Sequence, residues 1–258
     1  MTGESLQYPE EKETMEAGTS KNNPLLPENT VFTNELVLTQ DGSHTLYSAR
    51  FNQWYHSIHG ALEESKRIFL ELGLEYALSI WPDKKKIRIL EMGFGTGFNA
   101  LLTFLATQNL PITVHYTSLE AYPIPQEEYQ KLNYDEVMHT SILQRLHEAE
   151  WNTDVTLTET FILHKIHTPV EAYLDRFFQA EPFDVVYYDA FAPGSQPELW
   201  TSDIFQGIAK RLHVNSILTT YSAKGEVRRA LQAAGFRVEK HPGPGRKREV
   251  VRAICTNL

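Results

Sequence analysis

The sequence predicts an α/β fold in which helices cover both faces of a doubly wound, mostly parallel sheet. The first indication is an apolar segment, residues 87–92, which runs into three alternate glycines within residues 93–97 and then into a helix-compatible segment, residues 100–106. Strand, glycine turn and helix in this order form the first unit of a nucleotide-binding sheet. The second indication is residues 183–189, which are apolar through their middle, as is typical of a strand covered on both faces.

The spacing of the glycines distinguishes between classes of nucleotide ligand. The dinucleotide pattern G-x-G-x-x-G would require a glycine where the chain has Phe98. The chain instead has Glu-x-Gly-x-Gly-x-Gly, formed by Glu91, Gly93, Gly95 and Gly97. This pattern resembles motif I of Rossmann-like S-adenosylmethionine methyltransferases, whose glycines pass close to the methionine part of the cofactor. On this motif alone, a plain glycine-rich turn between strand and helix is the alternative.

Length and composition exclude several classes of protein. A chain of 258 residues forms one large domain or two small ones. No apolar run approaches the ~18 residues that span a bilayer, and the acidic, polar residues 1–30 do not have the pattern of a secretory signal. The single cysteine, Cys255, excludes an internal disulfide and a cysteine-based metal site, and it fits a reducing cytoplasm. His164 and His167 lack the further ligands that a metal site needs.

The charge is distributed unevenly along the chain. The net charge is −9, yet the residues from Gly207 onward contain 11 Lys and Arg and only 3 Glu, a local balance of +8. A basic C-terminal part on an acidic body favours local binding of a polyanion. A solvated face with cations near helix C-termini is the alternative.

The chain divides into three parts. Residues 1–30 lack periodicity and are expected to form a flexible tail. Residues 31–82 are expected to form an extension packed on the core: a hairpin of residues 31–38 and 45–48 around Asp41-Gly42, followed by a helix that ends near Trp81. Residues 83–258 form the sheet domain, with a helical insertion at about 123–152.

The remaining elements of the sheet domain follow from alternating apolar runs and turn signals. Strands are expected at residues 112–119, 161–166, 216–221, 236–240 and 249–254, and helices at 170–178, 197–212 and 225–234.

An acidic residue ends the second strand of the sheet. Glu120 follows the last glycine, Gly97, by 23 residues, which is close to the ~20 expected for an acid that binds the ribose hydroxyls of a nucleotide cofactor. A surface acid beside a loop is the alternative.

A second acid follows the fourth strand. Asp189 stands at the carboxyl edge of the sheet, where open α/β sheets bind their ligands. The segment Asp-Ala-Phe-Ala-Pro, residues 189–193, has the plan of the substrate motif of amino-group methyltransferases: a polar acceptor followed by a constrained loop with an aromatic residue. The Asp189 carboxylate would direct an amine, and Phe191 would stack on a flat substrate. A turn-capping aspartate and a core phenylalanine are the alternatives.

Four segments together are similar to one family. They are residues 91–99, residues 189–200 (Asp-Ala-Phe-Ala-Pro-Gly-Ser-Gln-Pro-Glu-Leu-Trp), residues 219–236 and residues 243–249 (Gly-Pro-Gly-Arg-Lys-Arg-Glu). They resemble the methyltransferase domain of the MnmC family of tRNA wobble-uridine enzymes, over roughly residue 33 to the C-terminus. The resemblance implies a Rossmann-like class I methyltransferase fold, with a seven-stranded, mostly parallel sheet and an antiparallel last strand.

The resemblance also implies roles for individual residues. The substrate-amine motif falls on Asp189 and Phe191. One departure concerns the adenine of the cofactor: the family's aspartate after the third strand is absent from residues 166–169, and Thr168 or a backbone carbonyl is expected to replace it. The cofactor positions are Glu63, Glu64, Glu91, Gly93, Gly95, Gly97, Asn99, Glu120 and Thr168, with helix-surface acids as the alternative for Glu63 and Glu64. The basic charges themselves indicate the candidate tRNA-phosphate contacts, which are Arg228, Arg229, Arg246, Lys247 and Arg248. A turn whose cations keep the sheet edge soluble is the alternative.

The function implied is S-adenosyl-L-methionine-dependent N-methylation of 5-aminomethyl(-2-thio)uridine at the tRNA wobble position, giving 5-methylaminomethyl(-2-thio)uridine. The expected partner is the anticodon stem-loop of tRNA in the cytoplasm, with no membrane, metal or flavin. The chain holds no second glycine fingerprint, so a stand-alone methyltransferase without the family's oxidase domain is expected. A small-molecule N- or O-methyltransferase and a non-catalytic tRNA-binding module are the alternatives.

Overall fold

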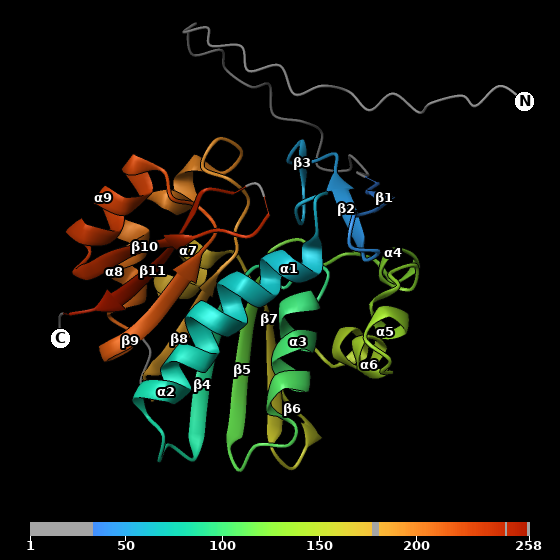
Figure 1. The fold of residues 1–258 in the computed structure, drawn as a ribbon, viewed down its shortest axis with the longest axis horizontal. Coiled ribbons are helices and arrows are strands. Elements are labelled where there is room, and N and C mark those ends of the chain that lie inside the picture. The colour runs from blue at the N-terminus through green and yellow to red at the C-terminus, as the bar shows by residue number, and fades with distance from the viewer. Residues whose placement is uncertain (1–32, 177–180, 246, 257–258) are drawn as a thin grey trace, which may run out of the picture. The chain divides into compact units, whose positions relative to one another are not determined.

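A twisted sheet of eight strands forms the centre of the computed structural model, which describes residues 33–176, 181–245 and 247–256 (Figure 1). Residues from Phe32 onward belong to one compact unit, and the expected tail, residues 1–30, lies outside the described residues. The strand order is β10-β11-β9-β8-β4-β5-β7-β6. The strands are β4 (Lys86–Met92), β5 (Thr113–Glu120), β6 (Asp154–Thr158), β7 (Phe161–His167), β8 (Phe183–Tyr188), β9 (Leu212–Thr220), β10 (Phe236–Pro242) and β11 (Glu249–Cys255).

The strand directions confirm the expected class of sheet. Strands β9, β8, β4, β5 and β7 are parallel to one another, and the last strand, β11, is antiparallel to both β9 and β10. The expectation of seven strands was wrong by one, because β6 adds an eighth, antiparallel to β7. Residues 154–158 contain Asp and two Thr, and only Leu157 among them is buried, so this short edge strand has little apolar signal.

Helices cover both faces of the sheet, and neighbouring residues of one strand belong to different layers. Tyr187 packs in the hydrophobic cluster beneath α3, whereas Tyr188 packs in the cluster beneath α8. Because successive side chains of a strand point to opposite faces, the β8 sequence is apolar throughout. Figure 1 draws the first layer in front of β4 and β5. The helices are α1 (Ala61–Ser65), a π-helical segment (Lys66–Glu75), α2 (Tyr76–Ile80) and α3 (Phe98–Thr107) in the first layer, and α7 (Val170–Leu174), α8 (Ser202–Ala209) and α9 (Gly225–Ala233) in the second.

A small separate sheet precedes α1. Strands β1 (Glu35–Leu38) and β2 (His44–Ser48) form the expected antiparallel hairpin, and β3 (Gln53–Trp54) adds a third strand that was not expected. The Asp41 carboxylate links this sheet to α1: it accepts hydrogen bonds from the backbone N–H of Ser43 (3.1 Å) and from that of Leu62 in the first turn of the helix (2.9 Å).

The expected helical insertion consists of three short helices, α4 (Gln126–Tyr129), α5 (Tyr134–Val137) and α6 (Ile142–Glu148). Side chains tie it to the small sheet. The Asn34 side chain donates to Glu128 (2.6 Å), and the Asn133 side chain accepts from the backbone of His44 (2.8 Å). The small sheet and the insertion therefore support each other beside the central sheet.

The predicted helix over residues 197–212 was wrong in extent. The chain forms one 3-10 turn, Pro197–Trp200, and α8 then begins anew after Thr201. Thr201 has an extended backbone and its hydroxyl accepts from the N–H of Ile204 (3.4 Å), as an N-cap does. Strand β9 begins at Leu212, four residues earlier than expected. The helix predicted over 170–178 ends at Leu174, and its last two residues lie outside the described part of the chain.

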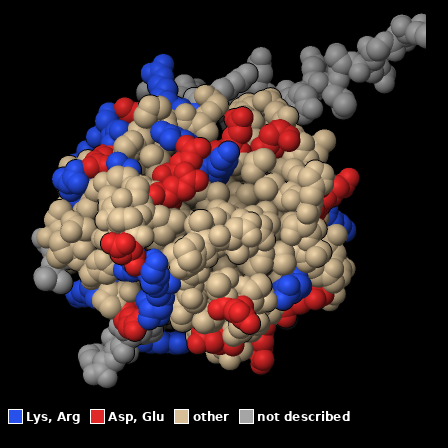
Figure 2. All heavy atoms as spheres, turned by 60° about the horizontal axis from the view of Figure 1, so that its bottom comes forward, with Lys and Arg blue, Asp and Glu red and all other residues tan. Residues whose placement is uncertain are grey.

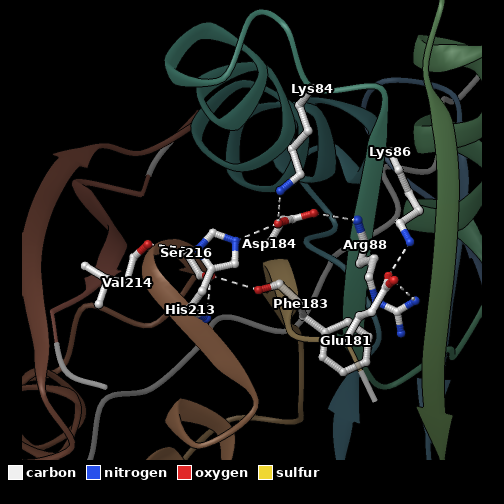
Figure 3. Close-up of polar contacts among 9 residues, drawn as sticks. All are labelled: Lys84, Lys86, Arg88, Glu181, Phe183, Asp184, His213, Val214 and Ser216. Carbon is white, nitrogen blue, oxygen red and sulfur yellow. Dashed lines mark hydrogen bonds and ion pairs between the residues drawn. The ribbon is translucent and has the colours of Figure 1, made fainter.

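The amino edge of the sheet is held together by one acid, Asp184 (Figure 3). Its carboxylate accepts from Lys84 Nζ (2.5 Å), from the backbone N–H of Arg88 (2.8 Å) and from His213 Nε2 (2.7 Å). These partners belong to the starts of β4 and β9, so Asp184 joins three neighbouring strands at the edge opposite the glycine turn. In the described part of the chain no helix is long and apolar enough to cross a membrane.

Candidate active site

The turn after β4 requires glycine at all three predicted positions. Gly93, Gly95 and Gly97 have φ angles of 92°, 49° and 74°, which side-chain-bearing residues rarely adopt. Neighbouring side chains also leave no room: a Cβ on Gly95 would lie 3.0 Å from Tyr55 Cδ1, and one on Gly97 would lie 3.1 Å from His147 Nε2. The turn is therefore built from bare backbone with aromatic rings packed over it.

Glu120 lies against this turn from the end of β5. Its Oε2 accepts from the N–H of Gly95 (2.9 Å) and its Oε1 from the N–H of Tyr122 (2.8 Å). Burial raises the pKa of this carboxyl, and these two backbone hydrogen bonds oppose the rise. Thr168 is buried beside it and donates its N–H to the Glu120 carbonyl (2.9 Å). Glu120, which was predicted to bind the ribose, and Thr168, which was predicted to contact the adenine, therefore lie together beside the turn. Their positions fit a cofactor that contains a nucleoside.

Asp189 stands directly beside the turn. The parallel register pairs Met92 with Tyr188, so the two residues that follow these strands are neighbours: a Cβ on Gly93 would lie 3.2 Å from the Asp189 carbonyl oxygen. Asn99 Nδ2 donates to Asp189 Oδ2 (2.8 Å). Burial raises the pKa of the Asp189 carboxyl to about 7, against the effect of this hydrogen bond. The acid and the glycine turn therefore share one edge of the sheet.

Two residues expected at the cofactor lie behind the turn. Glu91 is fully buried and accepts from the Ser118 hydroxyl (2.7 Å). Burial raises the pKa of Glu91 to about 8, so this side chain retains its proton at neutral pH. Asn99 is also buried, with its amide on Asp189. In this structure both residues support the turn and the acid from within.

Phe191 belongs to a group of aromatic rings at the same edge. Its ring stacks on Phe51 at 4.3 Å between centroids and meets Tyr55 edge-on at 5.1 Å. The backbone is held as well, because Trp200 Nε1 donates to the Phe191 carbonyl (2.8 Å). The Gln53 side chain accepts from the N–H of the next residue, Ala192 (2.9 Å). Phe191 is partly exposed, so it forms a wall of the site and not part of the core.

The two acids of α1 differ in burial. Glu63 is exposed, whereas Glu64 is buried and accepts from the backbone N–H of Ser57 (2.8 Å). Glu64 also forms an ion pair with Lys247 Nζ, one of the residues expected to contact RNA. Among the other predicted phosphate contacts, Arg229 and Arg248 are exposed, Arg228 is partly buried, and Arg246 lies outside the described residues.

The structure adds residues that the motifs did not reveal. Tyr55 and Gln53 come from the small sheet, and only the tertiary packing places them at the edge. Tyr221 follows the end of β9 and its hydroxyl donates to the Ala190 carbonyl (2.8 Å). A sequence signal existed for Tyr221, because ligands bind along the carboxyl ends of parallel strands. His147 Nε2 donates to the Thr96 carbonyl (2.9 Å), and no motif indicates this residue.

The predicted absence of a metal site stays a prediction. Within the described residues no group of three or more His, Cys, Asp or Glu is arranged to hold a metal ion. His164 instead contacts Asp154 (2.7 Å), and His167 contacts the Ala121 carbonyl (3.3 Å).

Comparisons with known proteins support the motifs. Residues 125–256 match the model of a family described as S-adenosyl-L-methionine-dependent methyltransferase. The protein named tRNA 5-methylaminomethyl-2-thiouridine biosynthesis bifunctional protein MnmC from Cupriavidus metallidurans is 32% identical over 84% of this chain, and that from Magnetococcus marinus is 33% identical over 83%. The chain spans about a third, 33%, of the length of these two relatives.

Solved structures agree with the fold. The crystal structure of MNMC2 from Aquifex aeolicus has a TM-score of 0.72 and 28% identity, with 88% of this chain and 71% of that chain covered. A probable spermidine synthase from Corynebacterium glutamicum, at 13% identity and a TM-score of 0.52 over 90% of this chain and 78% of its own, shares the fold alone. The expected Rossmann-like methyltransferase fold and the resemblance to MnmC proteins are confirmed, and the chain belongs to the S-adenosyl-L-methionine-dependent methyltransferase family.

Proposed function

We propose that this protein methylates the primary amine of 5-aminomethyl(-2-thio)uridine at the tRNA wobble position, giving the 5-methylaminomethyl nucleoside. The observation that carries the proposal is the position of Asp189, a carboxylate held by Asn99 beside the glycine turn. The names of the relatives, which concern 5-methylaminomethyl-2-thiouridine in tRNA, indicate the substrate. They do not favour the small-molecule enzyme or the non-catalytic module.

The roles of the residues follow from their positions. Residues 93–97, Glu120 and Thr168 would hold the cofactor, which when bound supplies an electrophilic methyl group on a sulfonium. Asp189 accepts an N–H of the amine and so directs the nitrogen lone pair toward the turn, an effect of alignment. The amine has to lose a proton as the new N–C bond forms, and the ionised Asp189 carboxylate is the acceptor in reach. Phe191 offers a ring face to the uracil.

The site also explains why an amine would be preferred to a hydroxyl. The Asp189 carboxylate is only an acceptor when ionised, and its Oδ2 is already used by Asn99. An amine reaches the site as an ammonium cation, which this negative charge attracts; after it loses one proton, it keeps an N–H on the remaining oxygen and has a lone pair for attack. A hydroxyl is neutral and lacks this attraction. We therefore propose N-methylation as the reaction type.

The test is methylation of two synthetic anticodon stem-loops by the purified protein with isotope-labelled S-adenosylmethionine. One stem-loop carries 5-aminomethyl-2-thiouridine at the wobble position and the other carries 2-thiouridine. Mass spectrometry of the digested nucleosides is expected to show labelled 5-methylaminomethyl-2-thiouridine from the first and no label in the second. Label in both, or in neither while a metabolite amine is methylated, would overturn the proposal.

A deletion strain gives the matching result in the cell. Its tRNA is expected to accumulate the 5-aminomethyl nucleoside, and a plasmid that carries the Asp189→Asn variant is expected not to restore the methylated form.

A further inference from the structure

A lysine from the C-terminal loop reaches into the edge of the sheet where Asp189 lies. Lys247 follows β10 and forms an ion pair with Glu64 on α1, although 183 residues separate the two in sequence. The Glu64 side chain is 10% exposed, and its second oxygen accepts from the N–H of Ser57. The carboxylate that receives the lysine is therefore fixed by the protein backbone and shielded from water.

The ammonium group of Lys247 also lies over an aromatic ring, that of Tyr221. Lys247 Nζ lies 4.5 Å from the centre of the Tyr221 ring, within the range of a cation–π contact. The Tyr221 hydroxyl donates to the carbonyl of Ala190, the neighbour of Asp189. The charge of Glu64 raises the pKa of the Asp189 carboxyl, and the charge of Lys247 lowers it. The charges of Asp189 and Glu64 both raise the pKa of Tyr221. The ammonium group of Lys247 thus lies between the Glu64 carboxylate and an aromatic face, and its charge acts on Asp189 nearby.

The group held there has the same chemistry as the proposed substrate. A lysine side chain ends in –CH2–NH3⁺, and the aminomethyl substituent of the uridine is also –CH2–NH3⁺. A carboxylate with an adjacent ring face is a general recognition site for such a cation. The protein therefore contains, next to its methyl-directing acid, a subsite that already binds this group.

We propose that Glu64 and Tyr221 form the subsite that receives the aminomethyl group of the substrate, and that Lys247 occupies this subsite until the substrate displaces it. The inference rests on the proposed function and deepens it, because it names the residues that recognise the incoming ammonium before Asp189 directs it. Glu64 then acts on the substrate and not on the cofactor.

The loop that carries Lys247 is built so that the side chain moves and the backbone stays. The N–H of Lys247 donates to the Pro244 carbonyl (3.0 Å), and the N–H of Gly243 donates to the Arg248 carbonyl (3.2 Å). A Cβ on Gly243 would lie 2.5 Å from the Lys247 carbonyl oxygen, so the turn is closed tightly. The Lys247 side chain is 38% exposed, and its flexible stem lets the ammonium leave toward solvent or toward a phosphate of the RNA.

Kinetics with a substrate that lacks phosphates separate displacement from phosphate binding. The substrate is the free nucleoside 5-aminomethyl-2-thiouridine, and the variants are Lys247→Met, which keeps the length of the side chain, and Glu64→Gln. When a side chain of the protein occupies a site, the ligand binds only to the fraction of molecules in which the site is free, and its apparent affinity falls in proportion to that fraction. Lys247→Met is therefore expected to lower KM for the nucleoside, and Glu64→Gln to raise it by about 10-fold. Both variants are expected to bind S-adenosylmethionine as the wild type does.

Lys240→Met is the matched control, because Lys240 pairs with Glu249 on the same β10–β11 hairpin, and it is expected to leave KM unchanged. A KM that rises or stays constant in Lys247→Met would overturn displacement. Loss of cofactor binding in Glu64→Gln would overturn the assignment of Glu64 to the substrate.

A labelling experiment keeps this inference separate from the proposed function. An amine-reactive reagent and mass spectrometry report how readily Lys247 reacts in the wild-type protein. In a short pulse, with the nucleoside in excess over the reagent and Lys240 as the reference lysine, 5-aminomethyl-2-thiouridine is expected to increase the labelling of Lys247 relative to Lys240, whereas 2-thiouridine is expected to leave this ratio constant. Equal labelling of Lys247 with both nucleosides would contradict the proposed subsite, even if the protein methylates tRNA. An increase with the aminomethyl nucleoside alone would support the subsite, even if methylation of tRNA is not found.

Discussion

Two acids with different environments, Glu91 buried and Asp189 partly exposed, share the edge of the sheet where the glycine turn lies. Glu91 sits behind the turn with its pKa raised to about 8, whereas Asp189 lies beside the turn with its pKa raised to about 7 and one oxygen on Asn99. Burial is the main cause in both cases. At neutral pH Glu91 therefore stays neutral, and Asp189 is the acid that ionises for work on an amine.

Replacement of Asp189 by Asn is expected to lower kcat/KM by about 100-fold or more, because the amine loses the carboxylate that directs its lone pair and takes up its proton. For the wild type, kcat/KM is expected to rise as pH rises through about 7, since only the ionised carboxylate accepts the N–H. Methylation of the aminomethyl stem-loop across pH, with calorimetry for cofactor binding, measures both. Asp83→Asn, an exposed acid ahead of β4, is the control. Normal turnover by Asp189→Asn would contradict the mechanism.

Replacement of Gly95 by Ala is expected to weaken cofactor binding by about 10-fold, because a residue held at positive φ stores roughly 1–3 kcal/mol of strain and its Cβ would press on Tyr55. Isothermal calorimetry with S-adenosylmethionine checks this. Gly194→Ala adds the same methyl group where no atom lies within 4 Å of the new Cβ, and it is expected to bind the cofactor normally. Equal affinities for the two variants would show that the shape of the turn is unimportant.

At the scale of elements, the two edges of the sheet have different tasks. The carboxyl edge holds Asp189 and the glycine turn, while the amino edge holds the hydrogen-bond cluster around Asp184. Burial disfavours ionised Asp184, yet hydrogen bonds from His213 and Lys84 outweigh it and hold the pKa of Asp184 below its ordinary value. The cluster stabilises β4, β8 and β9 in register without contributing to the chemistry.

Asp184→Asn is expected to lower the free energy of unfolding by about 3 kcal/mol, because the change removes the buried charge on which three partly exposed donors converge. Since the folded pKa is depressed, the contribution of Asp184 is present above the unfolded pKa of about 3.9 and is lost as pH falls through the folded value. Urea unfolding at several pH values is the measurement. The free energy of unfolding of the wild type is expected to be larger than that of the variant at pH 6, and this difference is expected to disappear below pH 4.

The neighbouring acid Glu181 is the control for this cluster. Glu181 is exposed and pairs with Lys86 at the same edge (Figure 3), so Glu181→Gln is expected to change stability little. Turnover per folded molecule is expected to be normal in both variants. A loss of activity in folded Asp184→Asn would show that the two edges are coupled.

At the scale of the whole molecule, the charge is divided between two regions. Figure 2 shows Lys and Arg gathered toward the left, the side on which Figure 1 draws α8, α9, β10 and β11, with acids interspersed. The chain as a whole carries −9, so RNA is repelled by most of the surface and attracted by this part. We therefore expect binding of tRNA to be oriented by the C-terminal elements.

Replacement of both Arg229 and Arg248 by Gln is expected to weaken tRNA binding. The slope of the logarithm of the binding constant against the logarithm of the salt concentration is expected to become shallower by about one for each phosphate contact removed. Both arginines are exposed on the C-terminal elements. Fluorescence anisotropy with labelled tRNA over a range of salt concentrations gives the slope. Lys85→Gln, exposed at the amino edge of β4, is the control. An unchanged slope in the double variant would place the RNA elsewhere.

Local patterns in the sequence were sufficient for the central sheet and for the neighbourhood of Asp189 and the glycine turn. Both residues follow buried parallel strands, and parallel strands bring their carboxyl ends to one edge, so the apolar runs of β4 and β8 already place Gly93 and Asp189 at the same edge. Their direct contact follows from the pairing of β4 with β8 in the structure. The positions of β6 and β3 were not predicted, because short, half-exposed strands depend on a partner strand and have no strong pattern of their own.

Only the tertiary structure decided what surrounds that edge. Tyr55 over the turn, Phe51 against Phe191, and Lys247 on Glu64 join segments far apart in the chain. Their side chains meet through the packing of the small sheet and the C-terminal hairpin on the core, and no local spacing records such contacts. The sequence by itself determined the chemistry available, a bare turn and an acid at one edge, because backbone conformation and strand burial are local properties. The partners of each charge depend on long-range packing, which only the folded chain reveals.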